Sequence, residues 1–163
     1  MSAIQSTPGS AGRAAAPRPV VTVKDVMTRH VACVTPDDTL QEAARQMRDL
    51  NVGPLPVRDD GRLVGMLTDR DITVRATASG IDPAAGHVRH AMTPDVVYCY
   101  EDQDVRDAAD TMAAHQIRRL PVLNREQKLV GIVSLGDLAV DAGPQSRSGQ
   151  VLKEVSEPAE PNR

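Results

Sequence analysis

Two short motifs join a hydroxyl to a carboxylate at the same spacing, Thr68-x-x-Asp71 and Ser134-x-x-Asp137. Each stands where a helix is predicted to start, so the hydroxyl and the free N–H groups of the helix can bind a phosphate. The same pattern is also typical of a helix capping box, in which the hydroxyl and the carboxylate satisfy backbone N–H groups. The two roles are compatible, and the motifs alone do not separate them.

A basic pair, Arg118-Arg119, stands immediately before a predicted strand that begins at Leu120. Two guanidiniums at the mouth of a cleft favour a ligand with a charged tail, because each presents a planar set of donors. Such a pair is also typical of a solvated surface or of a subunit contact. Arg70 is a third arginine that could bind a charged ligand, although a surface ion pair with a neighbouring aspartate explains it equally well.

Histidine and cysteine are too scattered to indicate a metal site. None of the zinc-type ligand spacings occurs among them. Cys33 and Cys99 are most simply small buried apolar side chains in a reducing compartment. No Ser/His/Asp or Cys/His grouping and no Walker or Rossmann loop is present. We therefore predict no metal site, no required cofactor and no enzymatic activity.

The candidate residues belong to an internal repeat. Met27-Thr28 recurs as Met92-Thr93, and Leu55-Pro56-Val57 recurs as Leu120-Pro121-Val122, both 65 positions later. After one inserted residue the offset becomes 66, and it aligns Leu63-Val64-Gly65 with Leu129-Val130-Gly131 and Asp71 with Asp137. Two copies of one supersecondary unit therefore stand in tandem, and the basic pair of the second copy replaces Gly53-Pro54 of the first.

Each copy has the pattern strand, helix, strand, strand, helix. The first strands are predicted at 30–35 and 96–100 from their β-branched or aromatic residues. A helix follows each, capped by Thr39 with Glu42 or by Asp104. In the first helix, Leu40, Ala43, Ala44, Met47 and Leu50 fall on one face, which predicts its buried side. Hairpins then join 54–58 to 63–67 and 120–123 to 129–133, and closing helices begin at Thr68 and Ser134.

The predicted fold class is α/β (α+β), with two β-α-β-β-α units packed about a pseudo-two-fold axis. Neither unit would be comfortably stable alone, and their pairing leaves two equivalent clefts. We predict a disordered N-terminal tail at 1–20, the first unit at 21–78, a linker at 79–87, the second unit at 88–142 and a flexible C-terminal tail at 143–163. The tails are rich in Ala, Pro, Ser and Gly and lack apolar periodicity.

Composition excludes several classes of protein. The net charge of −3, the pI near 5.8 and an aromatic content of 1% disfavour nucleic acid as a partner, because single-strand binders combine basic grooves with stacking aromatics. No apolar run reaches the length of about 18 residues that a membrane helix needs, and the N-terminus lacks the pattern of a signal peptide. We therefore expect a cytoplasmic protein with no membrane partner.

The repeated pattern resembles a pair of CBS domains, also called a Bateman module. Its elements are an Ala-Ala helix, a Leu-Pro-Val strand, a Leu-Val-Gly strand and Thr/Ser-x-x-Asp, and they span about residues 21–140. Residues 65–72, 80–83 and 115–122 are similar to small bacterial CBS-pair proteins of the hypoxic-response type. The resemblance implies clefts that hold AMP, ADP or ATP, with magnesium as an optional companion, and less often S-adenosylmethionine or NAD. It also implies a homodimer.

The resemblance assigns ligand contacts residue by residue. It implies that Asp71 and Asp137 accept the two ribose hydroxyls and that Arg118-Arg119 contact the phosphates. Walls for the adenine come from the strand ends, including Val52. The full set of predicted ligand-binding residues is Thr35, Leu55, Pro56, Thr68, Arg70, Asp71, Tyr100, Ile117, Arg118, Arg119, Leu120, Pro121, Ser134 and Asp137.

Four functions remain open at this stage. The leading hypothesis is a non-catalytic sensor that binds an adenosine ligand between its two copies and signals to a separate protein. Its main rival is a ligand-free interaction scaffold or stress-response protein, in which the motifs serve folding alone. A nucleic-acid-associated protein and an enzyme are the remaining alternatives.

Overall fold

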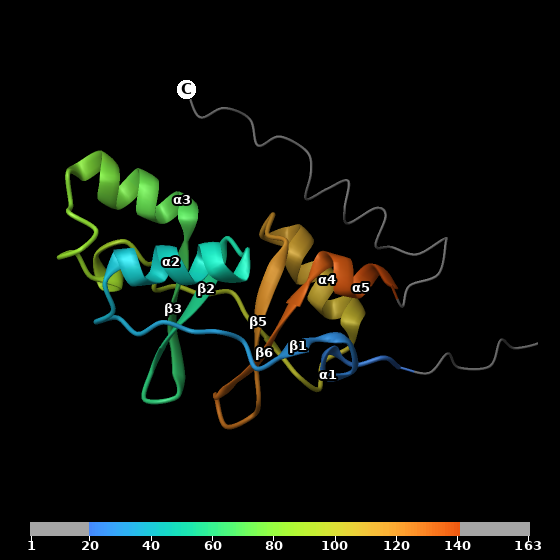
Figure 1. Ribbon diagram of the computed structural model, residues 1–163. Helices are drawn as coiled ribbons and strands as arrows, with labels where there is room; N and C mark the ends of the chain where they lie inside the picture. The colour runs from blue at the N-terminus through green and yellow to red at the C-terminus, as the bar shows by residue number, and fades with distance from the viewer. Residues whose placement is uncertain (1–19, 141–163) are drawn as a thin grey trace, which may run out of the picture.

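The structure is a computed structural model that describes residues 20–140 of the chain. The tails predicted at 1–20 and 143–163 lie, except for Val20, outside the described residues. The chain folds into two mixed α/β halves that lie side by side (Figure 1). The predicted fold class is thereby confirmed. No helix between residues 20 and 140 combines the length and the apolar character needed to cross a membrane.

The first repeat begins with a lead-in segment and continues into a helix, a hairpin and a closing helical region. Its elements are α1 (Val23–Val26), β1 (Thr28–Arg29), α2 (Leu40–Leu50), β2 (Pro54–Asp59), β3 (Arg62–Thr68), α3 (Asp69–Asp71), the π-helix η1 (Ile72–Ala76) and the 3₁₀-helix η2 (Thr77–Ser79).

The second repeat follows the same order. Its elements are the 3₁₀-helix η3 (Val88–His90), β4 (Cys99–Tyr100), α4 (Val105–Ala114), β5 (Arg119–Leu123), β6 (Leu129–Ser134) and α5 (Leu135–Val140). The strands form a four-stranded sheet in the order β1-β6-β5-β4 and a separate β2–β3 hairpin. Both hairpins are antiparallel, whereas β4 pairs with β5 in parallel.

The central helices begin where their caps predict. The Thr39 hydroxyl accepts a hydrogen bond from the Glu42 N–H (3.1 Å), and a carboxylate oxygen of Glu42 accepts one from the Thr39 N–H (3.0 Å). On α4, Asp104 accepts from the Arg106 N–H at 2.8 Å. The buried face of α2 is narrower than predicted, because Ala44 is exposed and Leu50 is 50% exposed. The helix ends at Leu50, and this side chain lies past the edge of the core.

The first strand of each repeat is much shorter than predicted. Residues 30–35 contribute a single parallel bridge, Val34 to Val57, and only Cys99 and Tyr100 of 96–100 form a strand. The physical reason is that the residues before each predicted strand pair with a strand of the other repeat. In the first repeat this departure coincides with His30, which has a positive φ of 55°. The predicted strand at 30–35 is therefore wrong in its extent.

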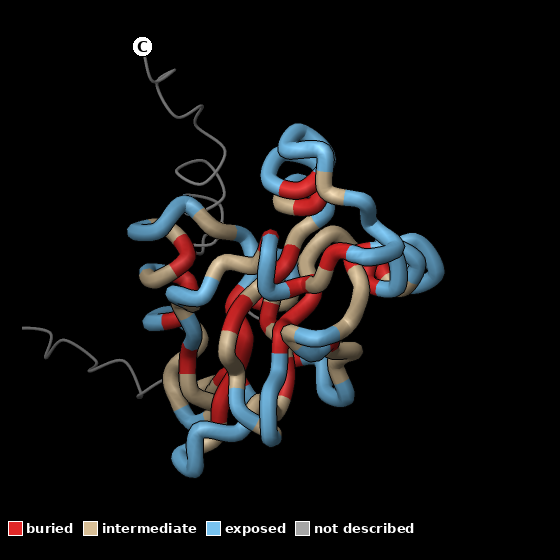
Figure 2. Tube along the Cα trace, turned by 90° about the vertical axis from the view of Figure 1, so that its left-hand side faces the viewer, coloured by how far each residue is buried: buried red, intermediate tan, exposed pale blue. Residues whose placement is uncertain are grey.

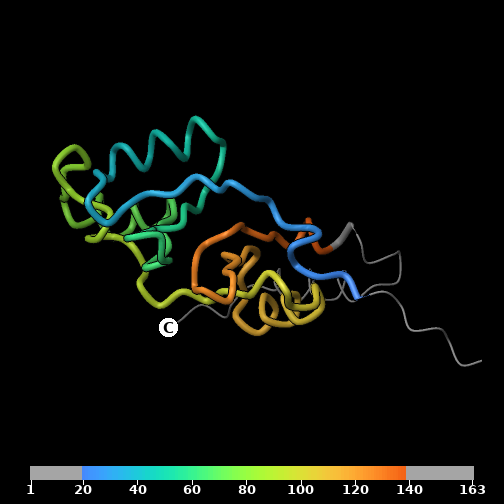
Figure 3. The backbone as a smooth tube through the Cα atoms, turned by 90° about the horizontal axis from the view of Figure 1, so that it is seen from below, coloured from blue at the N-terminus to red at the C-terminus, as the bar shows by residue number. Residues whose placement is uncertain are grey.

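The two repeats exchange these preceding segments reciprocally. Thr28 of β1 pairs with Ile132 on β6, and the equivalent Thr93 exchanges two backbone hydrogen bonds, of 2.8 and 2.9 Å, with Met66 on β3. Seen from below, the start of the described chain runs beside the second repeat before it crosses to the first (Figure 3). This reciprocity is the pseudo-two-fold relation that the sequence predicts.

Glycine permits each crossing. A Cβ on Gly65 would lie 2.9 Å from the sulfur of Met92, and a Cβ on Gly131 would lie 2.7 Å from the sulfur of Met27. Both distances are shorter than a Cβ tolerates, so the Leu-Val-Gly strands need glycine because another chain segment crosses them there.

The exchange divides the hydrophobic core into two shared clusters. One contains Val23 and Met27 from the lead-in of the first repeat together with Met112 and Leu120 of the second. The other combines Val88 and Ala91 of the second repeat with residues of α2, β2 and β3. Buried stretches follow the central strands, while the connecting loops are exposed (Figure 2). Each core therefore needs residues from both repeats.

Candidate functional site

A cleft of about 820 Å³ lies between the repeats and is lined by both of them. The first repeat contributes the start of β2 and the end of β3, and the second contributes the starts of β5 and α5. Residues 91–97, called the crossing segment because they pass from one repeat to the other, form a further part of the wall from Thr93 onward. The lining residues are Gly53, Pro54, Met66, Thr68, Asp69, Asp71, Thr93, Asp95, Val96, Val97, Ile117, Arg118, Arg119, Pro121, Ser134, Leu135 and Gly136.

The Thr68–Asp71 motif forms a complete capping box at the edge of this cleft. One oxygen of Asp71, Oδ2, accepts from the Thr68 N–H (2.9 Å) and from its hydroxyl (2.7 Å). In return, the Asp71 N–H donates to the Thr68 hydroxyl at 3.0 Å. The second oxygen, Oδ1, lies 3.5 Å from Nε of Arg75. The capping role is therefore present, and it occupies only one of the two carboxylate oxygens.

The Ser134–Asp137 motif repeats this geometry in the second repeat. Oδ2 of Asp137 accepts from both the N–H and the hydroxyl of Ser134, each at 2.7 Å. Ser134 lines the cleft, whereas Asp137 is not among the lining residues. Within residues 20–140, Asp137 has no counterpart to the Arg75 ion pair. The two motifs are alike in their backbone role and different in their relation to the cleft.

Arg118 and Arg119 stand at the start of β5, and both are exposed. Neither side chain forms an ion pair or a side-chain hydrogen bond with another residue of the described part of the chain. The Arg118 carbonyl accepts from the Leu135 N–H at 2.9 Å, as the Gly53 carbonyl accepts from the Asp69 N–H at 3.1 Å in the first repeat. This backbone hydrogen bond is therefore present in both repeats. In the second repeat two arginine side chains stand beside it, and in the first repeat there is none.

Several predicted residues lie away from the cleft lining. Leu55 and Leu120 are fully buried core residues, and Pro56 is buried with them. Thr35 and Arg70 are exposed and outside the lining. Val52, which was expected in an adenine wall, instead lines a separate outer pocket.

Tyr100 also lies apart from the cleft lining, in contact with the β5–β6 turn. Its hydroxyl accepts from the Gln127 side chain at 2.7 Å, and the Arg125 guanidinium lies 4.2 Å from the centre of its ring. Hydrogen bonding from Gln127 lowers the pKa of Tyr100. The ring is therefore held at the edge of the four-stranded sheet.

The cleft contains residues that motif analysis did not single out. Asp95, Val96 and Val97 come from the crossing segment, and Asp69 stands beside the predicted Thr68. The recurrence of Met27-Thr28 as Met92-Thr93 was the available signal for this segment, because it marks the point at which the chain enters the other repeat.

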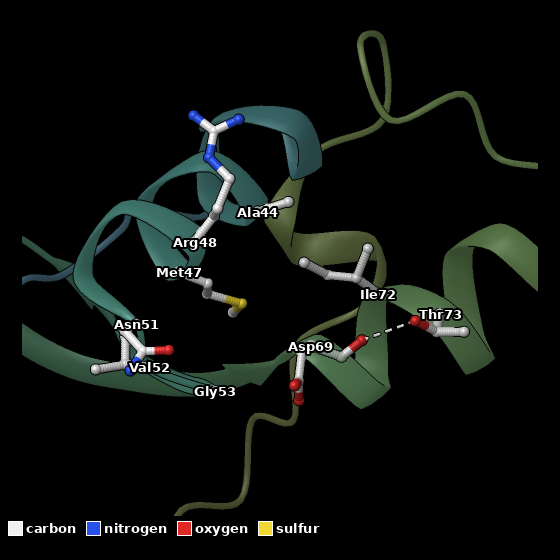
Figure 4. A pocket seen from close by; sticks show the side chains of 9 residues that line it. All are labelled: Ala44, Met47, Arg48, Asn51, Val52, Gly53, Asp69, Ile72 and Thr73. Atoms are coloured by element: carbon white, nitrogen blue, oxygen red, sulfur yellow. Dashed lines mark hydrogen bonds between the residues drawn. The ribbon is translucent and has the colours of Figure 1, made fainter.

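The outer pocket, of about 440 Å³, lies between α2 and the α3–η1 region (Figure 4). Met47 and Ile72 give it an apolar floor, and Arg48 and Asn51 stand at its rim. Thr73 donates its hydroxyl to the Asp69 carbonyl at 3.0 Å. Asp69 lines both this pocket and the cleft, as does Gly53. These two residues form the partition between the two cavities.

No group of three or more His, Cys, Asp or Glu side chains between residues 20 and 140 is arranged to hold a metal ion. Burial raises the pKa of the Cys99 thiol to about 12, and partial burial raises that of Cys33 as well. A high thiol pKa disfavours the thiolate that ligation or redox chemistry requires. Cys99 is buried in the core cluster of the second repeat, whereas Cys33 is half-buried.

Comparison with known proteins identifies relatives of the whole described chain. The model of the CBS domain matches residues 23–76 and 87–140. The CBS domain-containing protein YhcV of Bacillus subtilis is 47% identical over 134 residues, which cover 82% of this chain and 94% of the relative. Hypoxic response protein 1 of Mycobacterium tuberculosis is 36% identical over 140 residues, which cover 85% of this chain and 96% of the relative.

Solved structures agree with these relatives. A crystal structure of Hypoxic Response Protein I with two coordinated zinc ions matches with a TM-score of 0.67 and 38% identity, over 74% of this chain and 98% of that one. The structure of CBSX2 in complex with AMP matches with a TM-score of 0.64 and 29% identity, over 81% and 98%. A CBS domain pair in complex with 5′-methylthioadenosine and S-adenosyl-L-methionine matches with a TM-score of 0.61 and 29% identity, over 75% and 95%.

Proposed function

The chain belongs to the CBS-domain family, and from that premise we propose that it is a non-catalytic sensor of an adenosine nucleotide. The ligand is of the AMP, ADP or ATP class and binds in the cleft between the repeats. Occupancy of the cleft is signalled to a separate protein, because a ligand shifts the equilibrium towards whichever arrangement of the repeats it binds more tightly.

The observation that carries the proposal is the composition of the cleft wall. One cavity of about 820 Å³ brings together Asp71 of the first repeat and the Arg118-Arg119 pair of the second. Oδ1 of Asp71 is not used by the capping box, so it can accept ribose hydroxyls. The two guanidiniums have no side-chain partner among residues 20–140, and they suit a phosphate, to which arginine offers two parallel donors.

Apolar residues of the same cleft suit an adenine ring. Val96, Val97 and Ile117 line it together with Pro54 and Pro121. The volume lies within the range of about 300 to 1,000 Å³ that is usual for small-molecule sites. The bound AMP of CBSX2 and the bound adenosine compounds of the second complex support the same class of ligand for this chain.

A thermal-shift panel tests this proposal. The full chain is heated with AMP, ADP, ATP, S-adenosylmethionine or NAD, with and without magnesium. A nucleotide at about 100 times its dissociation constant adds about 2.7 kcal/mol of stability, which raises the melting temperature by several degrees. Adenosine and inorganic phosphate serve as part-ligand controls. A flat panel at millimolar ligand contradicts the sensor function.

The second candidate is a ligand-free interaction scaffold, and a specific observation favours it. In both repeats the Thr/Ser-x-x-Asp motif is engaged in a complete set of capping hydrogen bonds, with no ligand needed to explain it. Under this alternative the thermal-shift panel is flat, and replacing either aspartate lowers the stability of the chain because a cap is lost.

We further propose that the chain forms a homodimer through the helices of its outer surface. Leu50 on α2 is 50% exposed, and Val74 on η1 is 53% exposed. Covering such side chains is favourable because it removes apolar area from water. Sedimentation equilibrium of the native chain and of Leu50→Glu and Val74→Glu variants tests the proposal. A dimer that both variants retain would place the contact elsewhere, and a monomeric native chain would refute it.

A further inference from the structure

Arg75 joins the candidate ribose-binding carboxylate to the segment that crosses between the repeats. Its Nε lies 3.5 Å from Oδ1 of Asp71, the oxygen that the capping box leaves unused. Its Nη1 donates to the carbonyl oxygens of Ala91 (3.0 Å) and Met92 (3.1 Å). One guanidinium therefore contacts the cleft carboxylate and the crossing segment at the same time.

The crossing segment continues directly from these carbonyls into the cleft wall. Met92 covers Gly65, Thr93 pairs with Met66, and the chain then provides Asp95, Val96 and Val97 to the lining. Ala91 is 1% exposed, so its carbonyl is held in a part of the chain with little access to water. The bond to the Ala91 carbonyl is part-buried and the bond to the Met92 carbonyl is exposed, so the loss of the donor costs most at Ala91.

The backbone around Arg75 is unusual. Arg75 lies in the π-helix η1, whose wide turn is closed by the Thr77 N–H donating to the Ile72 carbonyl. Single π-helical turns are rare and occur frequently at functional sites. Here the π-helical turn carries a side chain that contacts both Asp71 and the crossing segment.

The described part of the second repeat has no such arrangement. The position equivalent to Arg75, 66 residues later, is Asp141, an acid that lies outside the described residues. The lead-in of the first repeat is tethered instead from within itself, by Arg29 donating to the Lys24 carbonyl at 3.1 Å. Between residues 20 and 140, the connection from a carboxylate to the crossing segment therefore involves Asp71 and not Asp137.

We infer that Arg75 is a positioning residue that couples occupancy of the Asp71 side of the cleft to the order of the crossing segment 91–97. The inference rests on the proposed nucleotide site and adds a route by which binding is communicated. A ligand whose ribose hydroxyls donate to Oδ1 of Asp71 competes with Arg75 for this oxygen, from which Nε of Arg75 lies 3.5 Å away. The guanidinium then bonds more fully with the Ala91 and Met92 carbonyls, which tightens the opposite wall of the same cleft.

Hydrogen exchange of the full chain, measured by mass spectrometry with AMP as the ligand, tests the coupling. In the native protein, AMP slows exchange in peptides that cover 66–72 and in those that cover 91–97. In Arg75→Ala, AMP binds about tenfold more weakly. At saturating AMP the variant keeps the protection of 66–72 and loses that of 91–97. Arg75→Lys, which retains the charge and a donor, restores part of the second effect.

The control is Arg45→Ala, which removes an exposed arginine from α2. Equal protection of 91–97 by AMP in Arg75→Ala and in this control would overturn the inference. Should Arg75→Ala fail to fold, Arg75→Gln retains a donor for the carbonyls and loses only the ion pair with Asp71. It must then bind AMP at least as tightly as the native chain, because Arg75 no longer competes for Oδ1 of Asp71, and AMP must no longer slow exchange in 91–97.

A native protein that does not bind AMP would refute the proposed function separately. In that case the ligand-free comparison still decides the positioning role. Exchange of the Met92 and Thr93 amides must be at least about tenfold faster in Arg75→Ala than in Arg45→Ala, as expected for loss of a coupling of typical size. Equal rates would overturn the role of Arg75 independently of any ligand.

Discussion

The two repeats share a backbone plan and differ in the chemistry they bring to the cleft. Gly53 and Arg118 accept equivalent backbone hydrogen bonds, yet Gly53 has no side chain and Arg118 carries an exposed guanidinium. The residues that donate these two hydrogen bonds also differ, because Asp69 of the first repeat corresponds to Leu135 in the second. The two repeats thus share the backbone contacts that hold the fold, whereas their side chains at the cleft differ.

This difference argues against two equal ligand sites. A nucleotide has one charged end, so a cleft with arginines on one repeat and a carboxylate on the other fixes its direction. Reversing the nucleotide would bring its phosphates towards Asp69 and Asp71, where like charges repel. The predictions that follow separate the symmetric part of the molecule from the asymmetric part.

The largest effect is expected where the two repeats cross. Gly131→Ala would place a Cβ 2.8 Å from the Thr28 carbonyl oxygen, and Gly65→Ala would place one 3.1 Å from that of Thr93. Overpacking of this kind costs about 1 to 3 kcal/mol, and we expect Gly131→Ala at the upper end and Gly65→Ala at the lower. Urea unfolding measures both.

The control for the crossing is Gly136→Ala on α5, where the nearest atom to the new Cβ is the Ser134 hydroxyl at 3.6 Å. Alanine is favoured over glycine inside a helix, so this variant should be as stable as the native chain or slightly more stable. Equal destabilisation by all three substitutions would contradict the exchange of segments described above.

The next prediction concerns the two equivalent aspartates. Asp71→Asn should weaken nucleotide binding by about tenfold or more, because a hydrogen bond to a charged acceptor contributes about 1.5 to 3 kcal/mol. Asp137→Asn should change it little, since Asp137 does not line the cleft. Isothermal titration with AMP measures both. Asparagine keeps an acceptor for the capping bonds, so the two variants should remain folded. A larger loss of AMP affinity in Asp137→Asn than in Asp71→Asn would place the ribose beside Asp137 of the second repeat instead.

Local patterns in the sequence predicted most of the fold. The caps at Thr39 and Asp104 and both hairpins follow from residues within a few positions of each other, and the structure contains them. The internal repeat predicted the pseudo-two-fold relation. The strands at 30–35 and 96–100 were predicted too long, because β propensity does not reveal that the preceding chain departs to another partner.

The cleft was less accessible to sequence reasoning than the fold. Thr68, Asp71 and the arginine pair were found by motif and by family position, whereas the wall from Thr93 onward depends on the exchange between the repeats. Arg75 had no signal at all, since its role comes from a π-helical turn and from carbonyls 16 and 17 residues away. Leu55 and Leu120 show the opposite error, in which apolar residues of the expected type are simply core.

The arginine pair gives a third test of the asymmetry. Replacing Arg118 and Arg119 together by alanine should weaken AMP binding by at least about tenfold and leave the affinity for adenosine nearly unchanged, because only the phosphate loses donors. The salt dependence of AMP binding should fall at the same time. Titrations with AMP and adenosine at two salt concentrations measure both effects. An equal loss for adenosine would mean that the arginines shape the cleft instead of binding phosphate.

The smallest expected effect compares the caps of α2 and α4. Thr39→Ala and Asp104→Ala each remove a helix cap and should cost about 1 kcal/mol at neutral pH, while Thr39→Ser should cost little. Hydrogen bonds from the backbone and hydroxyl of Thr39 lower the pKa of Glu42 below its ordinary value of 4.5. The stabilisation that the Glu42 carboxylate gives to the cap is therefore fully present above the pKa of Glu42 in the unfolded chain. It is lost as the pH falls through the lower pKa of Glu42 in the folded chain.

The cost of Thr39→Ala should accordingly shrink as the pH falls below about 4.5, and in a Glu42→Gln background it should not vary with the charge of that residue. Urea unfolding at a series of pH values measures the difference. A cost that stays constant down to pH values well below this range would assign the stabilisation to the Thr39 hydroxyl alone. The α2 cap would then differ from that of α4, where the cap is itself a carboxylate: hydrogen bonds from the Arg106 side chain and backbone lower the pKa of Asp104, so its contribution is lost at low pH.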